Sequence, residues 1–199
     1  MDEKKFLGEV FCANLTNHRS SGHIAKRLGE SKAVVERHLA LLRKKGLVAG
    51  SPSSPRLTEK GRRKIKVVFT GGSYEIVHPG HLYTIEQARK LGDVLVLVLA
   101  RSSTIRKRKG REPVTQEADR LALTSSLRQV DAAILGVKGS IYETMEKVNP
   151  DVVALGYDQH HAEIEIRREA RKRGMRLRVV RLDALDFDVK TSKILAEFI

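Results

Sequence analysis

This chain of 199 residues has one cysteine and no tryptophan, and aromatic residues make up only 5% of it. A single cysteine excludes a disulfide within the chain and is typical of proteins from a reducing compartment. No apolar stretch approaches the roughly 20 residues that a membrane helix requires. The first ten residues, MDEKKFLGEV, lack the apolar core of a signal peptide. We therefore expect a cytoplasmic protein that has no membrane partner.

Negative charge is the scarcer sign, with 24 acidic residues against 38 lysines and arginines, which gives a formal net charge of +14. The excess is uneven, because residues 1–64 carry +9 of it and the rest of the chain carries +5. A concentrated positive charge indicates a polyanionic partner, and nucleic acid is the first candidate. A richly charged surface is also typical of thermophilic proteins and needs no partner. Composition alone does not choose between these interpretations.

The first third of the chain has the pattern of three short helices followed by a hairpin. Apolar residues recur at helical spacing over 4–16, 21–29 and 32–45, and Gly29 and Gly46 mark two of the ends. A Ser/Pro-rich turn over 50–55 then separates two short apolar stretches. Two short helices joined by a tight turn predict a helix-turn-helix, in which the second helix of the pair reads DNA.

The stretch IAKRLGESKAVVERHLALLRKKGLV resembles the winged-helix family of transcription regulators. The resemblance implies a DNA-binding domain over residues 1–63. It places on the groove side of the reading helix Ser31, Lys32, Val34, Arg37 and His38. It also implies that the wing and its flank contact phosphates through Arg56, Lys60, Arg62 and Arg63. The alternative is a winged helix used for protein interaction or dimerisation.

From residue 64 onward, apolar runs alternate with helical patterns. The runs fall at 67–69, 94–100, 132–137, 152–155 and 177–182, and they are rich in Val, Ile and Leu. Helical patterns lie at 82–91, 116–127, 141–148, 163–173 and 192–199. This alternation predicts an α/β domain over 64–199 with an open, parallel, five-stranded, Rossmann-like sheet covered on both faces. Ligands of such sheets bind at the carboxyl ends of the strands.

The first of these runs leads into VVFTGGSYEIVHPGH, residues 67–81, which is the most informative motif in the chain. A glycine turn between a strand and a helix lets backbone approach a phosphate, and the helix N-terminus attracts the negative charge. His78 and His81, three residues apart, fall on one face of the first helical turn. The motif therefore predicts a site for a phosphorylated ligand.

With HPGH after a strand, residues 66–199 resemble the HxGH nucleotidyltransferases, which have the cytidylyltransferase-like fold. Within that superfamily the chain is most similar to archaeal FAD synthases and next to glycerol-3-phosphate cytidylyltransferases. The resemblance implies transfer of a nucleotidyl group from a nucleoside triphosphate to a phosphate acceptor, with release of pyrophosphate. It implies Mg²⁺ and ATP with FMN, or alternatively CTP with glycerol 3-phosphate.

The resemblance also assigns residues. It implies a catalytic role for His78, His81, Lys109 and Arg120. It implies nucleotide binding by Thr70, Gly71, Gly72, Ser73, Tyr74, His78, Gly80, His81, Gly156, Asp158, Gln159, Thr191 and Ser192. It implies acceptor binding by Glu75 and Arg111, and charge neutralisation by Arg111 and Lys193. Lys109 and Arg111 belong to a basic stretch, ARSSTIRKRKGREPV, interpreted as a loop against the triphosphate, and no metal ligand is assigned.

One departure from the family bears on activity. The family commonly has G-T-F-D before the histidines, whereas this chain has Gly72-Ser73-Tyr74-Glu75. Glu75 lengthens a carboxylate that the resemblance places near the acceptor or the metal, so it alters specificity or weakens catalysis. The other reading is a transcription regulator whose second domain senses a flavin or nucleotide without catalysis. A homodimer is compatible with both readings.

Overall fold

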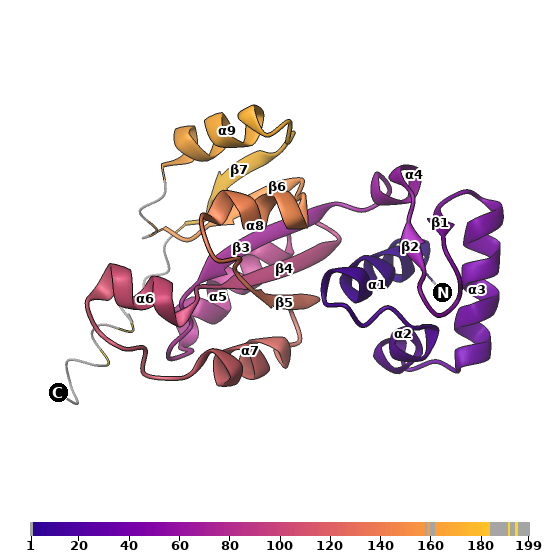
Figure 1. The fold of residues 1–199 in the computed structure, drawn as a ribbon, viewed down its shortest axis with the longest axis horizontal. Helices are drawn as coiled ribbons and strands as arrows, with labels where there is room; N and C mark the ends of the chain where they lie inside the picture. The colour runs from indigo at the N-terminus through magenta and orange to yellow at the C-terminus, as the bar shows by residue number, and fades with distance from the viewer. Residues whose placement is uncertain (1, 158, 160–161, 184–190, 192–193, 195–199) are drawn as a thin grey trace. The chain divides into compact units, whose positions relative to one another are not determined.

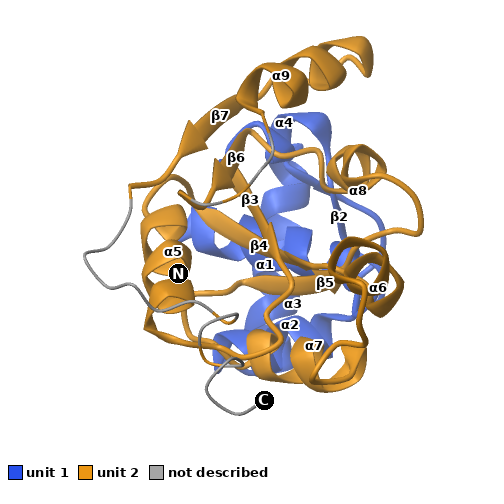
Figure 2. Cartoon of the chain, turned by 90° about the vertical axis from the view of Figure 1, so that its left-hand side faces the viewer, with its two compact units in different colours: residues 1–66 blue, residues 67–199 orange. Residues whose placement is uncertain are grey.

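The computed structural model describes residues 2–157, 159, 162–183, 191 and 194 (Figure 1). The chain divides into two compact units, Met1–Lys66 and Val67–Ile199 (Figure 2). No helix in the described part of the chain is long and apolar enough to cross a membrane.

The first unit consists of three helices, a two-stranded sheet and a final helical turn. The elements are α1 (Glu3–Leu15), α2 (Ser21–Leu28), α3 (Lys32–Lys44), β1 (Val48–Ala49), β2 (Arg56–Leu57) and α4 (Glu59–Arg62). Asp2, Ser20 and Ser31 cap the three helices, because each side chain accepts a hydrogen bond from a backbone N–H in the first turn. β1 and β2 pair antiparallel. The core of the unit is formed by Phe6, Leu7, Val10, Ile24, Val35, Leu39 and Leu42.

The second unit is built on five parallel strands with helices between them. The strands are β3 (Val67–Gly72), β4 (Val94–Leu99), β5 (Ala132–Leu135), β6 (Val152–Leu155) and β7 (Arg178–Arg181). The helices are α5 (Pro79–Arg89), α6 (Ser102–Lys109), α7 (Glu117–Ser125), α8 (Ile141–Val148) and α9 (Glu163–Lys172). The strand order is β5-β4-β3-β6-β7, and every pairing is parallel (Figure 1). The predicted α/β class with an open, parallel, five-stranded sheet is therefore confirmed.

Both faces of this sheet are buried. Val68, Leu95 and Leu97 pack with Ile85 and Ala88 of α5 in one apolar cluster. The alternate positions along the same strands point to the opposite face and are buried as well. Covered faces explain why the strands are continuous apolar runs rather than alternating ones.

The strand order places the predicted motif at the centre of the sheet. The chain runs from β3 outward through β4 to β5, and then crosses to β6 on the other side of β3. Loops that leave the carboxyl ends of β3 and β6 therefore diverge, and this is where open parallel sheets bind ligands. The stretch from 102 to 109, expected to be a basic loop, is instead the helix α6. The helix predicted over 192–199 lies outside the described residues, except Ile194.

Candidate active site

The turn after β3 depends on a glycine. A Cβ added at Gly72 would lie 2.8 Å from Cε2 of Tyr74, which is closer than such atoms approach. Tyr74 has a φ of 48°, a conformation uncommon for a residue with a side chain. This fold-back buries the Tyr74 ring, which is 2% exposed, against the His81 ring at 4.9 Å between centroids. The turn therefore packs directly on the first turn of α5.

The two histidines lie together at the N-terminus of α5. His78 is the N-cap residue and Pro79 the first helical residue, and the centroids of the His78 and His81 rings are 3.9 Å apart. Burial, and next the charge of His78, lower the pKa of His81 to about 4. His81 is therefore neutral at pH 7, and its buried Nδ1 has no hydrogen-bond partner among the described residues. The positive end of the helix dipole lies at the same place.

Glu75 is the buried carboxylate of this site. Its side chain is 0% exposed, and it accepts hydrogen bonds from Lys109 Nζ, from Arg111 Nη1 at 2.8 Å and from the Val114 N–H at 3.2 Å. Burial acts to raise the pKa of the carboxyl, but the hydrogen bonds from Lys109, Arg111 and Val114 outweigh it and lower that pKa. Glu75 is thus ionised at neutral pH and holds two cations that are themselves just over one third exposed.

Arg120 fastens three segments of backbone to one another. Its guanidinium is 1% exposed and donates to the carbonyls of Ser73 at 2.8 Å, Ala100 at 2.7 Å and Thr115 at 3.2 Å. Burial lowers its pKa. The carbonyls belong to the turn after β3, to the end of β4 and to the segment that precedes α7. Arg120 therefore joins the loops of the site to one another.

The loop after β6 closes on the same turn. Gln159 Nε2 donates to the carbonyl of Gly71 at 2.6 Å, so this side chain spans from the loop to the end of β3. Arg181 at the end of β7 donates to the carbonyls of Gly156 at 3.1 Å and Gln159 at 3.0 Å. Arg181 was missed at the sequence level, although a charged residue at the carboxyl end of a buried strand is a signal that could have found it.

The structure brings together most of the predicted residues of this site, but they differ in burial and in hydrogen-bond partners. Thr70 is fully buried, so it shapes β3 rather than reaching solvent. Gly80 lies in the first turn of α5, where its carbonyl accepts from Thr84 Oγ1 at 3.0 Å. Asp158, Ser192 and Lys193 lie outside the described residues, and Thr191 is described without its neighbours.

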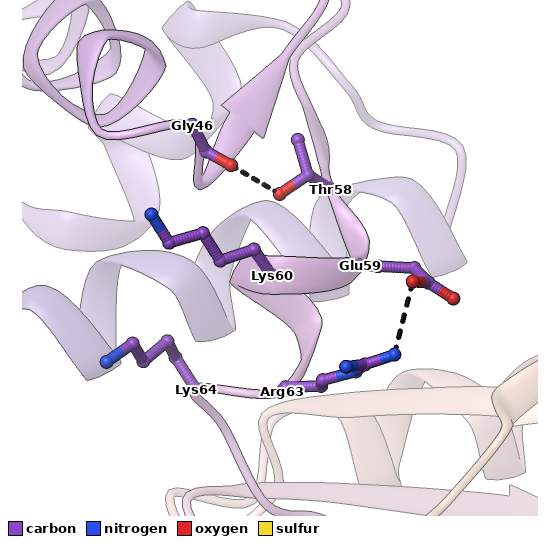
Figure 3. Close-up of a pocket in the computed structure, with 6 residues that line it drawn as sticks. All are labelled: Gly46, Thr58, Glu59, Lys60, Arg63 and Lys64. Atoms are coloured by element: carbon purple, nitrogen blue, oxygen red, sulfur yellow. Dashed lines mark hydrogen bonds and ion pairs between the residues drawn. The ribbon is translucent and has the colours of Figure 1, made fainter.

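A hollow in the first unit is lined by residues of α4 and its neighbours, and its arrangement of charges differs from that of the site around the histidines (Figure 3). Lys60 and Lys64 extend to one side of α4, whereas Arg63 pairs with Glu59 on the other side. Lys60 Nζ donates to the carbonyl of Lys45 at 3.0 Å. The charged groups of Lys60, Lys64 and Arg63 do not point toward one another, so this hollow lacks the geometry of a phosphate site.

The residues predicted to face DNA lie on α3, on the hairpin and on α4 with its C-cap residue. Lys32, Val34 and Arg37 are exposed on α3, and Arg56 is exposed on β2. Arg62 is arranged differently, because its guanidinium lies 5.5 Å over the Phe11 ring and donates to the Ile65 carbonyl at 3.0 Å.

The described residues contain no group of three or more His, Cys, Asp or Glu side chains that could hold a metal ion. Glu75, three residues before His78 in the chain, is already engaged by two cations. Mg²⁺ commonly keeps few protein ligands and is held in large part by substrate phosphates. The donors described here fit that arrangement and do not fit an all-protein metal site.

Three comparisons relate the chain to known proteins. The family model named cytidylyltransferase-like matches residues 69–196. An FAD synthase from Aciduliprofundum boonei is 48% identical over 115 residues, which are 58% of this chain and 76% of the relative. An FAD synthase from Thermococcus onnurineus is 40% identical over 144 residues, which are 71% of this chain and 96% of the relative. A crystal structure described as the lipopolysaccharide core biosynthesis protein from Thermoplasma volcanium GSS1 superposes with a TM-score of 0.59 at 41% identity, and covers 61% of this chain and 99% of that one. Residues 1–66 lie outside the family match.

Proposed function

The chain belongs to the cytidylyltransferase-like family of nucleotidyltransferases, and we propose that it is an FMN adenylyltransferase, which makes FAD from FMN and ATP. The observation that carries the chemistry is the pair of neighbouring histidine rings at the positive end of α5, beside the glycine turn. The observation that favours FMN and ATP is the 40–48% identity to archaeal FAD synthases.

In this proposal, a phosphate oxygen of FMN attacks the α-phosphorus of ATP in line. One P–O bond forms, the bond between the α-phosphorus and the bridging oxygen breaks, and pyrophosphate leaves with that oxygen. The protein holds the reacting groups in place and stabilises the charge that develops. His78 and His81 would donate hydrogen bonds to the phosphate oxygens. The low pKa of His81 keeps its ring neutral, and a neutral ring still has one N–H to donate.

The cations have two different roles. Lys109 and Arg111 are partly exposed and would contact the phosphates, whereas Glu75 fixes their position from the buried side. Arg120 is better described as a positioning residue, since its donors are occupied by backbone carbonyls. Gly71, Gly156 and Gln159 would border the nucleotide. A divalent cation such as Mg²⁺ would neutralise the triphosphate charge.

The direct test is to incubate the purified chain with ATP and FMN, and separately with CTP and glycerol 3-phosphate. FAD, identified by chromatography, together with pyrophosphate is expected from the first pair. Pyrophosphate from the second pair alone would establish a cytidylyltransferase instead. Tight binding of a nucleotide without product from either pair would favour a ligand sensor over an enzyme.

We propose DNA binding as a second function, carried by residues 1–66. It is supported by the exposed face of α3, where Lys32, Arg37 and Lys44 lie among small or apolar residues, and by exposed Arg56 on the hairpin. Mixed Arg, Lys and apolar side chains suit base edges and phosphates in a major groove. Ser31 is the N-cap residue of the same helix. A DNA site made of two half-sites would require the chain to bind as a homodimer. Light scattering of the protein–DNA complex measures how many chains it contains.

A matched pair of variants tests this second function. Arg37→Ala removes a charge from the exposed face of α3, and Lys5→Ala removes an exposed charge from α1. We expect Arg37→Ala to weaken binding to the DNA upstream of the chain's own gene about tenfold, and Lys5→Ala to leave it nearly unchanged. Equal effects, or a salt-dependent affinity with no sequence preference, would reduce the proposal to non-specific attraction.

A further inference from the structure

The helix α9 and the strand β7 that follows it concentrate positive charge at one edge of the second unit. Residues 163–181, which span both elements, contain eight lysines and arginines against three glutamates, an excess of five. The whole stretch from 65 to 199 carries the same excess, so the remainder of the domain is neutral on balance. Figures 1 and 2 both show α9 beside β7, the edge strand of the sheet. A positive excess localised on one element indicates a polyanionic partner.

Many of these charges lie on the solvent-exposed face of α9. One surface hollow is lined by Ile164, Arg167, Arg168, Arg171 and Lys172, which we call the basic face. The side chains of Arg167, Arg168 and Lys172 are 50%, 63% and 62% exposed. Ile166 and Ala170 of the same helix are buried, so α9 is held by its apolar side and presents the basic face to solvent.

Ion pairs within the chain do not neutralise the basic face. Glu163 and Glu169 are each already shared by two close cations. Arg168 approaches Glu169 only to 3.8 Å, and Arg171 has no ion-pair partner among the described residues. Positive charge therefore remains for a partner to neutralise.

The spacing of these cations acts against the helix itself. Arg167 and Arg171 are four residues apart, as are Arg168 and Lys172, and like charges at this spacing repel each other. The helix dipole favours Arg171 and Lys172 in the last turn, but Arg167 and Arg168 lie one turn earlier. A helix face that is only solvated typically alternates the two signs. A partner that brings negative charge would remove the repulsion.

The composition of the basic face matches phosphates better than a membrane or a protein surface. A membrane-binding helix needs a row of exposed apolar side chains, whereas Ile164 is the one apolar residue among the five. Protein interfaces have cores depleted of charge, whereas four of the five residues are cations. Three of these are arginines, which bind phosphate through two parallel hydrogen bonds. The cations recur after one helical turn, about 5.4 Å, so the face can meet more than one phosphate.

We infer that the basic face of α9 binds the phosphate backbone of duplex DNA without reading its sequence. The inference goes beyond both proposed functions, because none of the five residues belongs to the histidine site or to residues 1–66. It rests on the DNA binding proposed for residues 1–66 only in the choice of DNA over RNA. Contacts of this kind add affinity and position a protein on a duplex, but they carry no sequence information.

The test compares two double substitutions that remove the same charge from the full chain. Arg168→Gln with Arg171→Gln neutralises part of the basic face, and Lys90→Gln with Arg128→Gln removes two exposed cations elsewhere in the second unit. Fluorescence anisotropy of a labelled duplex of unrelated sequence gives the affinity over a series of salt concentrations. We expect the first pair to reduce the slope of log affinity against log salt by about 2, and the affinity at low salt about tenfold. The second pair should leave the slope unchanged.

Two controls make the result specific. The first pair should weaken binding to the unrelated duplex and to the DNA upstream of the chain's own gene by the same factor, whereas loss of sequence preference alone would remove only the role proposed for α3. Its thermal unfolding temperature should not fall, because both substitutions relieve like-charge repulsion. Equal slopes for the two pairs would overturn the inference, as would a wild-type chain that binds no duplex. So would tighter binding of duplex RNA than of DNA, or a first pair that loses only its binding to phosphatidylserine vesicles.

Discussion

Replacing Glu75 by glutamine tests whether this carboxylate organises the acceptor side of the site. The side chain is fully buried and accepts from Lys109, Arg111 and the Val114 N–H. Glutamine keeps the shape and one acceptor oxygen, but it removes the charge and points an N–H₂ group at a cation. We therefore expect the segment from 109 to 115 to lose its anchor while the sheet beneath stays folded.

The size of the loss in unfolding free energy depends on how much hydration Lys109 and Arg111 can regain after the substitution. Removing one member of a buried ion pair costs about 3–5 kcal/mol because the remaining charge is left without solvent. Lys109 and Arg111 are just over one third exposed, so each can regain water after the substitution. We therefore expect the free energy of unfolding to fall by about 2 kcal/mol, between that range and the ~0.5 kcal/mol of a surface pair.

The matched control is Glu112→Gln, in the same segment. Glu112 is 69% exposed and pairs with Arg106 at 3.0 Å, so we expect a loss within ~0.5 kcal/mol. Urea unfolding followed by circular dichroism measures both losses, since the chain has no tryptophan to report by fluorescence. Hydrogen exchange of residues 109–115 provides the local reading. Equal exchange in the two variants would refute the role given to Glu75.

The pH dependence supplies an independent check. The pKa of Glu75 is lowered from its ordinary value of 4.5, so the unfolded chain takes up this proton first as the pH falls. The stability that Glu75 contributes is therefore fully present above pH 4.5, and it is lost as the pH falls through the folded-state pKa. The difference between wild type and Glu75→Gln should be largest at pH 7 and should shrink in acid.

Three further predictions concern the same site. Arg120→Met leaves three backbone carbonyls without their donor and should lower the free energy of unfolding by ~3 kcal/mol, with Arg120→Lys recovering only part of it in thermal unfolding. Gly72→Ala introduces a 2.8 Å contact with the Tyr74 ring, so turnover should fall at least tenfold in the pyrophosphate assay, and the loss should be smaller when Tyr74 is also replaced by leucine. The pKa of His81 is lowered from 6.5 to about 4, so the stability that the neutral ring contributes is present above pH 6.5 and is lost as the pH falls towards 4. Between pH 7 and 5 the free energy of unfolding, measured in urea, should therefore fall by about 2 kcal/mol more in wild type than in His81→Asn.

Local patterns in the sequence were sufficient for the sheet and for the histidine pair. Continuous Val and Leu runs predict strands that are covered on both faces, and β3 and β4 are such strands. His78 and His81 are three residues apart on a helix that begins at Pro79, so their proximity follows from helical geometry alone. Neither prediction requires a contact between distant parts of the chain.

The helix α6 was not predicted, and its stabilising contacts show why. Its sequence, SSTIRKRK, contains a single buried residue, Ile105, so it has no apolar period to detect. The helix begins where Glu117, fifteen residues later, accepts from the Ser102 N–H at 2.6 Å, and it ends at Gly110 with a φ of 66°. A cap supplied from that distance cannot be inferred from the helix's own residues.

The placement of Arg120 is also a tertiary result. Its position in the chain matched a family arginine, and a catalytic role followed from the match. The structure shows hydrogen bonds from its guanidinium to the carbonyls of Ser73 and Ala100, 47 and 20 residues earlier. Spacing gives no access to such partners, because the guanidinium reaches them only after β3 and β4 have paired.

The residues that depart from the family's G-T-F-D pattern have mutually dependent contacts in this chain. Ser73 contributes its carbonyl to Arg120, and Tyr74 occupies the space that a side chain at position 72 would need. Glu75, one methylene longer than aspartate, reaches both Lys109 and Arg111 while it stays buried. A shorter carboxylate on the same backbone would have to draw residues 109–115 inward, and Val114 with them. The length of Glu75 is therefore coupled to the positions of Lys109, Arg111 and Val114, because all three donate to the one carboxylate.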